Sequence, residues 1–144
     1  MDTNLTFNFL VAEHLAIESE AIAMCDSLEG KKTLNETLFT GLDNLGNLVK
    51  AHLHNEEVLL AGLSQAQIDD SRLQLWIAAA NDFDRLRSDW LSFLAEWDLD
   101  TIERRRAEFA VSARSILGRL TERVRFESET FYVVAVQSGA LRQQ

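Results

Sequence analysis

The chain of 144 residues contains no proline and six glycines, so few residues interrupt a helix. It also has a single cysteine, Cys25, which excludes a disulfide within the chain. We expect Cys25 to be a small core residue, because its surroundings are apolar. The scarcity of residues that break helices therefore favours long helices held together by apolar packing.

Long hydrophobic segments are also missing. No apolar run approaches the roughly 20 residues that a membrane-spanning helix needs. Residues 1–8 are polar and lack a positively charged start, so they do not resemble a signal peptide. We therefore expect a cytoplasmic protein with no membrane partner.

Positive charge is scarce, with 14 Lys and Arg against 23 Asp and Glu and a net charge of −9. Phosphate binding needs a basic surface, so we expect no nucleic-acid partner. Residues 101–144 are the exception, with 8 Arg and 5 Glu. We expect this basic segment to pack beside acidic neighbours. A docking surface led by Arg104, Arg105 and Arg106 is the alternative.

Common catalytic motifs are absent from the sequence. No Ser or Cys stands beside a base in a recognisable context, and no glycine-rich phosphate loop occurs. The His-x-x-Lys-Gly context of a phosphotransfer bundle is missing around His52 and His54. These absences predict that the protein is not an enzyme.

Apolar residues recur at helical spacing over four segments. The spacing predicts helices over residues 5–28, 33–63 and 101–138. It also predicts a third helix that begins between residues 64 and 71 and ends at residue 97. Thr33 with Glu36, and Asp100 with Glu103, are predicted to cap two of these helices, and Gly30 is placed to end the first.

Short connections between such helices favour antiparallel neighbours. We predict one all-α domain over residues 1–144, an up-down-up-down antiparallel four-helix bundle. Trp76, Trp90 and Trp97 fall on the apolar stripe of the third helix and are expected in the core. Phe126 and Tyr132 lie off the apolar stripe of the last helix. An apolar patch formed by these two residues is a candidate surface for a homodimer.

Polar side chains interrupt the apolar stripes at positions one helical turn apart. They are His14 and Glu18, His52 and Glu56, Arg123 and Glu127, and on the third helix Arg87 alone. Residues at i and i+4 lie above one another on a helix, so each pair points into the bundle. Buried ionisable groups must be paired or bound to metal, and imidazole with carboxylate suits iron, zinc or manganese. His54 and Glu57 are expected to face solvent.

These positions resemble the hemerythrin-like family of His-His-Glu cation-binding bundles over nearly the whole chain. The motifs that carry the resemblance are Ala12-Glu13-His14-Leu15, His52-x-x-x-Glu56-Glu57, residues 81–87 and residues 123–129. The resemblance implies His14, His52 and bridging carboxylates at Glu56 and Glu127. It also implies histidines at three positions where this chain has Phe83, Arg87 and Arg123. The nitrogen ligands of one iron are therefore missing.

Two interpretations follow. In the first, an internal network of arginine and carboxylate replaces the metal, and the protein is a non-enzymatic binding or regulatory bundle with an unidentified protein partner. Phe83 then fills the volume of a lost imidazole. The residues of this network are Glu18, Arg87, Arg123, Glu56 and Glu127.

In the second interpretation, one iron or zinc ion binds to ligands from three helices, and the protein senses oxygen or redox state. The four ligands are His14, His52, Glu56 and Glu127. A third alternative is an oxidative or hydrolytic enzyme that uses that ion with an open coordination position.

Overall fold

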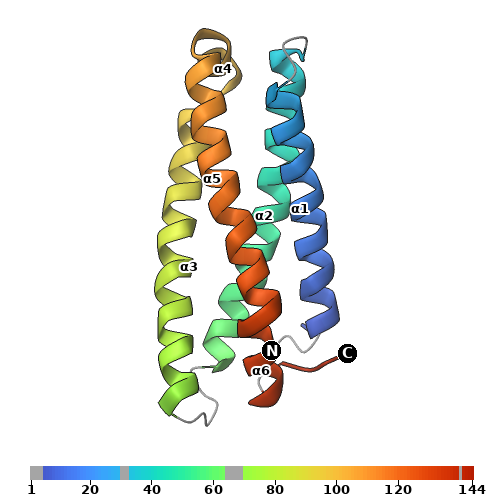
Figure 1. Cartoon of the computed structure of the whole chain (residues 1–144), viewed down its shortest axis with the longest axis vertical. Helices are drawn as coiled ribbons and strands as arrows, with labels where there is room; N and C mark the ends of the chain where they lie inside the picture. The colour runs from blue at the N-terminus through green and yellow to red at the C-terminus, as the bar shows by residue number, and fades with distance from the viewer. Residues whose placement is uncertain (1–4, 30–32, 64–69, 140) are drawn as a thin grey trace.

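The computed structural model describes residues 5–29, 33–63, 70–139 and 141–144 (Figure 1). The elements are α1 (Phe7–Glu29), α2 (Asn35–Leu63), α3 (Asp70–Glu96), α4 (Leu99–Arg104), α5 (Arg106–Phe126), the π-helix η1 (Glu127–Phe131) and α6 (Tyr132–Gln137). Apart from an isolated bridge between Thr6 and Arg142, no β-structure occurs within these ranges. The all-α prediction is confirmed.

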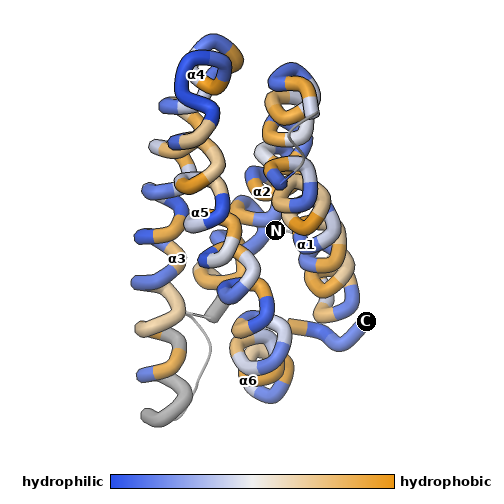
Figure 2. The backbone as a smooth tube through the Cα atoms, turned by 45° about the horizontal axis from the view of Figure 1, so that its top comes forward, coloured by the Kyte–Doolittle hydropathy of each residue, from blue (hydrophilic) through white to orange (hydrophobic). Residues whose placement is uncertain are grey.

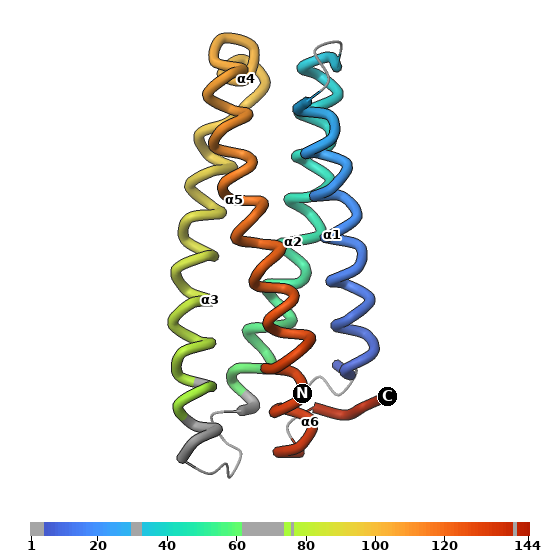
Figure 3. Tube along the Cα trace, in the orientation of Figure 1, coloured from blue at the N-terminus to red at the C-terminus, as the bar shows by residue number. Residues whose placement is uncertain are grey.

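The long helices α1, α2, α3 and α5 lie along one axis (Figure 1). α1 packs against α2 and α5, and α3 packs against the same two helices. The colours of Figures 1 and 3 show that successive long helices run in opposite directions. The two ends of the described chain meet at one end of the molecule, where the Phe7 amide donates to the Arg142 carbonyl at 2.7 Å.

The helix boundaries differ from the prediction mainly in the C-terminal third. A continuous helix over 101–138 is wrong, because Arg105 (φ −134°, ψ 43°) separates α4 from α5 and a π-helix follows α5. The carboxylate of Asp98 accepts a hydrogen bond from the Thr101 amide at 2.8 Å. Asp98, rather than Asp100, therefore caps this helix, while α2 begins two residues after Thr33. Residues 30 and 64–69 lie outside the described residues.

Hydrophobic and hydrophilic residues alternate along each long helix (Figure 2), and the buried hydrophobic residues form two clusters. The larger cluster includes Ile17, Val49, Leu86 and Val124. The smaller one consists of Leu10, Leu59, Ala79, Phe131, Tyr132, Ala135 and Leu141. Among the residues whose side chains the structure describes, the buried polar ones are His14, His52, Glu56, Arg123 and Glu127.

These polar residues separate the two clusters on α1 and α2. On α1, His14 lies between Leu10 of the smaller cluster and Ile17 of the larger one. On α2, the pair His52 and Glu56 lies between Val49 and Leu59 in the same way. The polar side chains therefore form one layer across the bundle.

The tryptophans in and just after α3 are core residues where their side chains are described. Trp90 and Trp97 are buried, and the Trp97 ring packs edge-on against Phe109 at 5.3 Å between centroids. The side chain of Trp76 lies outside the described residues. Cys25 is partly buried against the larger cluster, as expected. Across the described residues, every helix is too short or too polar to cross a membrane.

The contrast between Leu10 and Leu15 tests this packing within one helix. Leu10 is 0% exposed and Leu15 is 63% exposed. We expect Leu10→Ala to lower the free energy of unfolding by about 2–5 kcal/mol, because it leaves a cavity. Leu15→Ala should change it by less than about 0.5 kcal/mol. Urea unfolding followed by circular dichroism measures both, and equal losses would contradict this placement of α1.

Candidate metal centre

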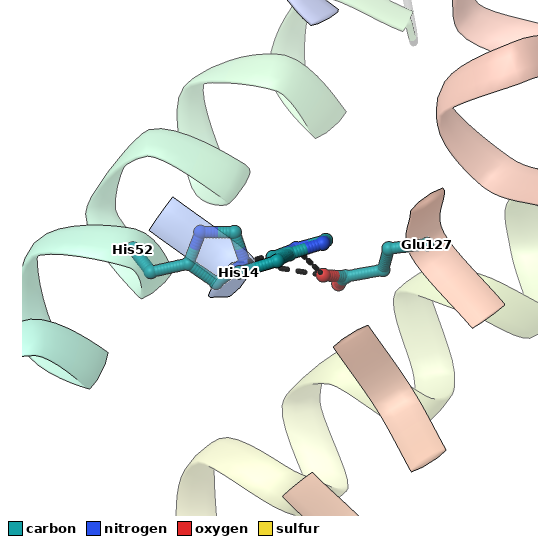
Figure 4. A group of neighbouring side chains, drawn as sticks. All are labelled: His14, His52 and Glu127. Atoms are coloured by element: carbon teal, nitrogen blue, oxygen red, sulfur yellow. Dashed lines mark hydrogen bonds and ion pairs between the residues drawn. The ribbon is translucent and has the colours of Figure 1, made fainter. Parts of the chain in front are cut away.

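Three ligand-type atoms from three elements converge in the polar layer (Figure 4). His14 Nε2 and His52 Nε2 lie 3.1 Å apart, although the two histidines come from α1 and α2. Glu127 Oε1, at the start of η1, lies 2.8 Å from the first nitrogen and 3.1 Å from the second. All three side chains are buried, so no bulk water separates these atoms.

The spacing of these atoms suits a bound cation. Iron or zinc holds nitrogen and oxygen ligands at about 2.0–2.2 Å, which places neighbouring ligand atoms roughly 3.0–3.5 Å apart. Two further oxygens lie at similar spacing: Glu56 Oε2 is 3.3 Å from His52 Nε2, and the Tyr132 hydroxyl is 3.0 Å from His14 Nε2. The donor set therefore fits one ion held by imidazole and carboxylate.

The outer nitrogens of both histidines also have partners. His52 Nδ1 lies 3.0 Å from the Glu13 carboxylate, whose other oxygen accepts from Asn55 Nδ2 at 2.9 Å. An ionised carboxylate only accepts, so it favours the proton on Nδ1 and leaves the Nε2 lone pair facing the centre. His14 Nδ1 contacts the Ser128 hydroxyl at 2.6 Å. Metal-binding histidines are commonly oriented by such contacts.

Arg123 joins the two buried carboxylates from the opposite side. Its Nε donates to Glu127 Oε2 at 2.6 Å, and one terminal nitrogen donates to Glu56 Oε1. The other terminal nitrogen donates to the Ala79 carbonyl of α3 at 2.9 Å. Each carboxylate therefore turns one oxygen to the guanidinium and the other to the histidines.

Burial and pairing shift the pKa values of these groups in opposite directions. Burial raises the pKa of Glu56 to about 8, and the charge of Glu127 adds to that shift. Burial would also raise the pKa of Glu127, but hydrogen bonds from Glu56, His14 and His52 hold it well below its usual value. Glu127 is therefore the carboxylate that stays ionised.

The histidines differ in the same way. Burial would lower the pKa of His52, but hydrogen bonds with Glu127, Glu13 and Glu56 raise it well above its usual value. Burial lowers the pKa of His14, and its hydrogen bond with Glu127 offsets only part of this. With Arg123 and Glu127 charged, one proton shared between His52 and Glu56 makes the layer neutral. A divalent cation would compete with that proton for the same lone pairs.

Two members of the network predicted from sequence do not join this layer. Arg87 is on the surface, where its side chain is 43% exposed and pairs with Glu57 at 3.4 Å, so placing it inside the bundle was wrong. Glu18 is partly exposed, and no hydrogen bond or ion pair within the described ranges connects it to the layer. His54 and Glu57 are exposed, as expected, and Phe83 is buried on α3.

Tyr132 is the residue that helical periodicity misplaced. Its side chain is 0% exposed, and its hydroxyl donates to Glu127 Oε1 at 3.2 Å, so it is not part of an exposed patch. The π-helix adds a residue to the turn between Glu127 and Phe131, which brings Tyr132 round to the face of Glu127. A period of 3.6 residues carries no signal of this. Sequence analysis also missed Glu13 and Ser128. Each is the sequence neighbour of a residue on an inward-facing stripe but does not lie on that stripe itself.

Comparison with known proteins gave no match: no family model fits the chain, and no curated protein or solved structure is significantly similar to it. The likeness to hemerythrin-like bundles therefore rests on the residues described above. It remains a prediction.

The two arginines of the predicted network now give a matched test. Arg123→Ala should lower the free energy of unfolding of the metal-free protein by about 3–5 kcal/mol, because it leaves buried carboxylates without their partner. Arg87→Ala removes an exposed pair and should cost less than about 1 kcal/mol. Denaturant unfolding of both variants measures this difference. A loss below 1 kcal/mol for Arg123→Ala would show that the guanidinium does not hold the layer together.

Proposed function

We propose that this chain is a hemerythrin-like four-helix bundle of up-down-up-down topology that binds one iron or zinc ion. The ligands would be His14, His52 and Glu127, with Glu56 beside them. The observation that carries this proposal is the convergence of two imidazole nitrogens and one carboxylate oxygen within a buried layer. Such a group of lone pairs needs a proton or a cation among its members.

One ion, rather than two, fits the residues on the other side of the carboxylates. Arg123 contacts both Glu56 and Glu127 there, as a second cation would. Phe83 supplies no ligand atom, and Arg87 lies outside the layer. Arg123 therefore serves as a permanent second cation, which keeps the central part of the hypothesis that arginine replaced metal.

We further propose a binding or regulatory role for this site rather than catalysis. Its ligands are nearly fully buried, which suits a structural or sensing ion better than turnover of a bulky substrate. Bound iron would supply a centre that can change its oxidation state, whereas zinc would supply a fixed charge. A cytoplasmic location and an unidentified protein partner belong to the same proposal.

Metal content tests the ligand set directly. Protein purified without chelator should contain about one equivalent of iron or zinc per chain, measured by inductively coupled plasma mass spectrometry. His52→Ala should lose this metal, because it removes a central nitrogen. His54→Ala removes an exposed histidine two residues away and should retain the metal. Equal metal content in the two variants would exclude binding at the buried layer.

Removal of the metal should destabilise the fold. A ligand that binds only the folded state adds about 2.7 kcal/mol of stability when its concentration is 100 times its Kd. We therefore expect a chelator to lower Tm and added Zn²⁺ or Fe²⁺ to restore it. Glu127→Gln, which keeps the shape of the side chain and removes its charge, should abolish the restoration. If neither metal changes the Tm of the wild-type protein, the polar layer binds no ion and the arginine–carboxylate network alone stabilises it.

A further inference from the structure

Tyr132 adds a fourth atom, an oxygen, to the ligand-type atoms that converge in the polar layer. Its hydroxyl oxygen lies 3.0 Å from His14 Nε2, 3.4 Å from His52 Nε2 and 3.2 Å from Glu127 Oε1. The two nitrogens and the carboxylate oxygen lie 2.8 to 3.1 Å from one another. Every pair among the four atoms is therefore separated by 2.8 to 3.4 Å.

Four points at nearly equal separations are the corners of a tetrahedron. A tetrahedron with edges of about 3.1 Å has its centre about 1.9 Å from each corner, close to the roughly 2.0–2.2 Å at which zinc holds nitrogen and oxygen ligands. Tetrahedral coordination by four protein ligands is also the usual arrangement of structural zinc sites. The four atoms therefore surround one position whose size suits a small cation.

The backbone of η1 brings the Tyr132 oxygen to this position. Residues five apart on an α-helix point about 140° away from each other. The Tyr132 amide instead donates to the Glu127 carbonyl, which is the hydrogen bond of a π-helix, so the two side chains share a face. Single π-helical turns occur frequently at functional sites. The break in α-helical geometry thus lies at the pair of residues that it brings together.

The Tyr132 side chain is fixed by its surroundings. It is 0% exposed, and its ring stacks on His14 with 5.0 Å between centroids and 21° between planes. Burial raises the pKa of Tyr132 well above its usual value, so the phenol keeps its proton in the metal-free protein and donates it to Glu127. A bound cation reverses this preference, because it takes the deprotonated form of a ligand.

Glu56 is the other candidate for a fourth ligand. One of its oxygens accepts from Arg123, and the other lies 3.3 Å from His52 Nε2. In the described part of the chain, no hydrogen bond or ion pair joins Glu56 to His14. The Tyr132 oxygen contacts all three ligand atoms, so it completes the tetrahedron where Glu56 does not.

We propose that Tyr132 is the fourth ligand of the ion, which makes the site a closed tetrahedron of two imidazoles, one carboxylate and one phenolate. This inference rests on the proposed function, because it requires that the polar layer binds a metal. When the ion binds, the O–H bond of Tyr132 breaks, its proton is released to the solvent, and the phenolate oxygen bonds to the metal. A closed site holds a structural or redox-active ion, since a hydrolytic one needs an open position.

The wild-type protein itself can report this ligand, because Tyr132 is the only tyrosine of the chain. Titration of the full chain with Zn²⁺ should produce the ultraviolet difference spectrum of tyrosinate and saturate at about one equivalent. Fe³⁺, supplied as its nitrilotriacetate complex, should produce the visible charge-transfer band of a ferric phenolate. Mass spectrometry of the same samples measures the bound metal. Metal bound without either signal would overturn the role of Tyr132 and leave the three-ligand site standing, whereas absence of bound metal would overturn the proposed function as well.

Tyr132→Phe removes only the hydroxyl oxygen. It should abolish both signals and still bind Zn²⁺ through the other three ligands, at least about tenfold more weakly. Adding Phe9→Tyr to this variant returns a tyrosine to a position that is 47% exposed, and the signals should stay absent. Signals in this double variant, or unchanged Zn²⁺ affinity in Tyr132→Phe, would overturn the proposal. The wild-type titration needs no substitution, so the test stands even if Tyr132→Phe disturbs the fold.

Discussion

The contact of one guanidinium with two buried carboxylates is the interaction on which the centre of this bundle depends. Arg123 reaches Glu56, Glu127 and the Ala79 carbonyl, so it connects three elements besides its own helix. Burying such charges gains little over an apolar core, because desolvation offsets most of the attraction. What the pairing supplies is orientation: each carboxylate is held by one oxygen, so its other oxygen must face the histidines.

This orientation divides the polar layer into two unequal halves. On one side the compensating cation is covalently part of the chain and cannot lose its charge. On the other side the compensating charge is exchangeable: a proton holds this place in the metal-free protein, and in the proposed site a metal ion would lie among His14, His52 and Glu127. Glu13 extends the exchangeable half outward, because its carboxylate reaches His52 from the partly exposed rim. A bundle with one permanent and one exchangeable cation is suited to reporting the state of the second.

The helix α2 faces the polar layer on one side and α3 on another. His52 and Glu56 face the polar layer, whereas Lys50 and Leu53 line a cleft against α3. The larger hydrophobic cluster packs around the same helix through Leu45 and Val49. This packing holds α2 in place, so the polar layer is built on a packed helix rather than on loops. Rigid placement matters for ion binding, since ligand atoms must be held to within a fraction of an ångström.

Local spacing alone predicted the long helices and most of the buried polar residues, because residues four apart share a helix face whatever the surroundings. It therefore identified His14, His52, Glu56, Arg123 and Glu127. Which neighbours contact these residues became clear from the packing of the helices. The exposed position of Arg87 depends on how α3 is rotated, and the contact of Tyr132 depends on a π-turn that no period of 3.6 residues encodes. Both features depend on contacts between helices that are distant in sequence, and the local spacing of residues carries no information about those contacts.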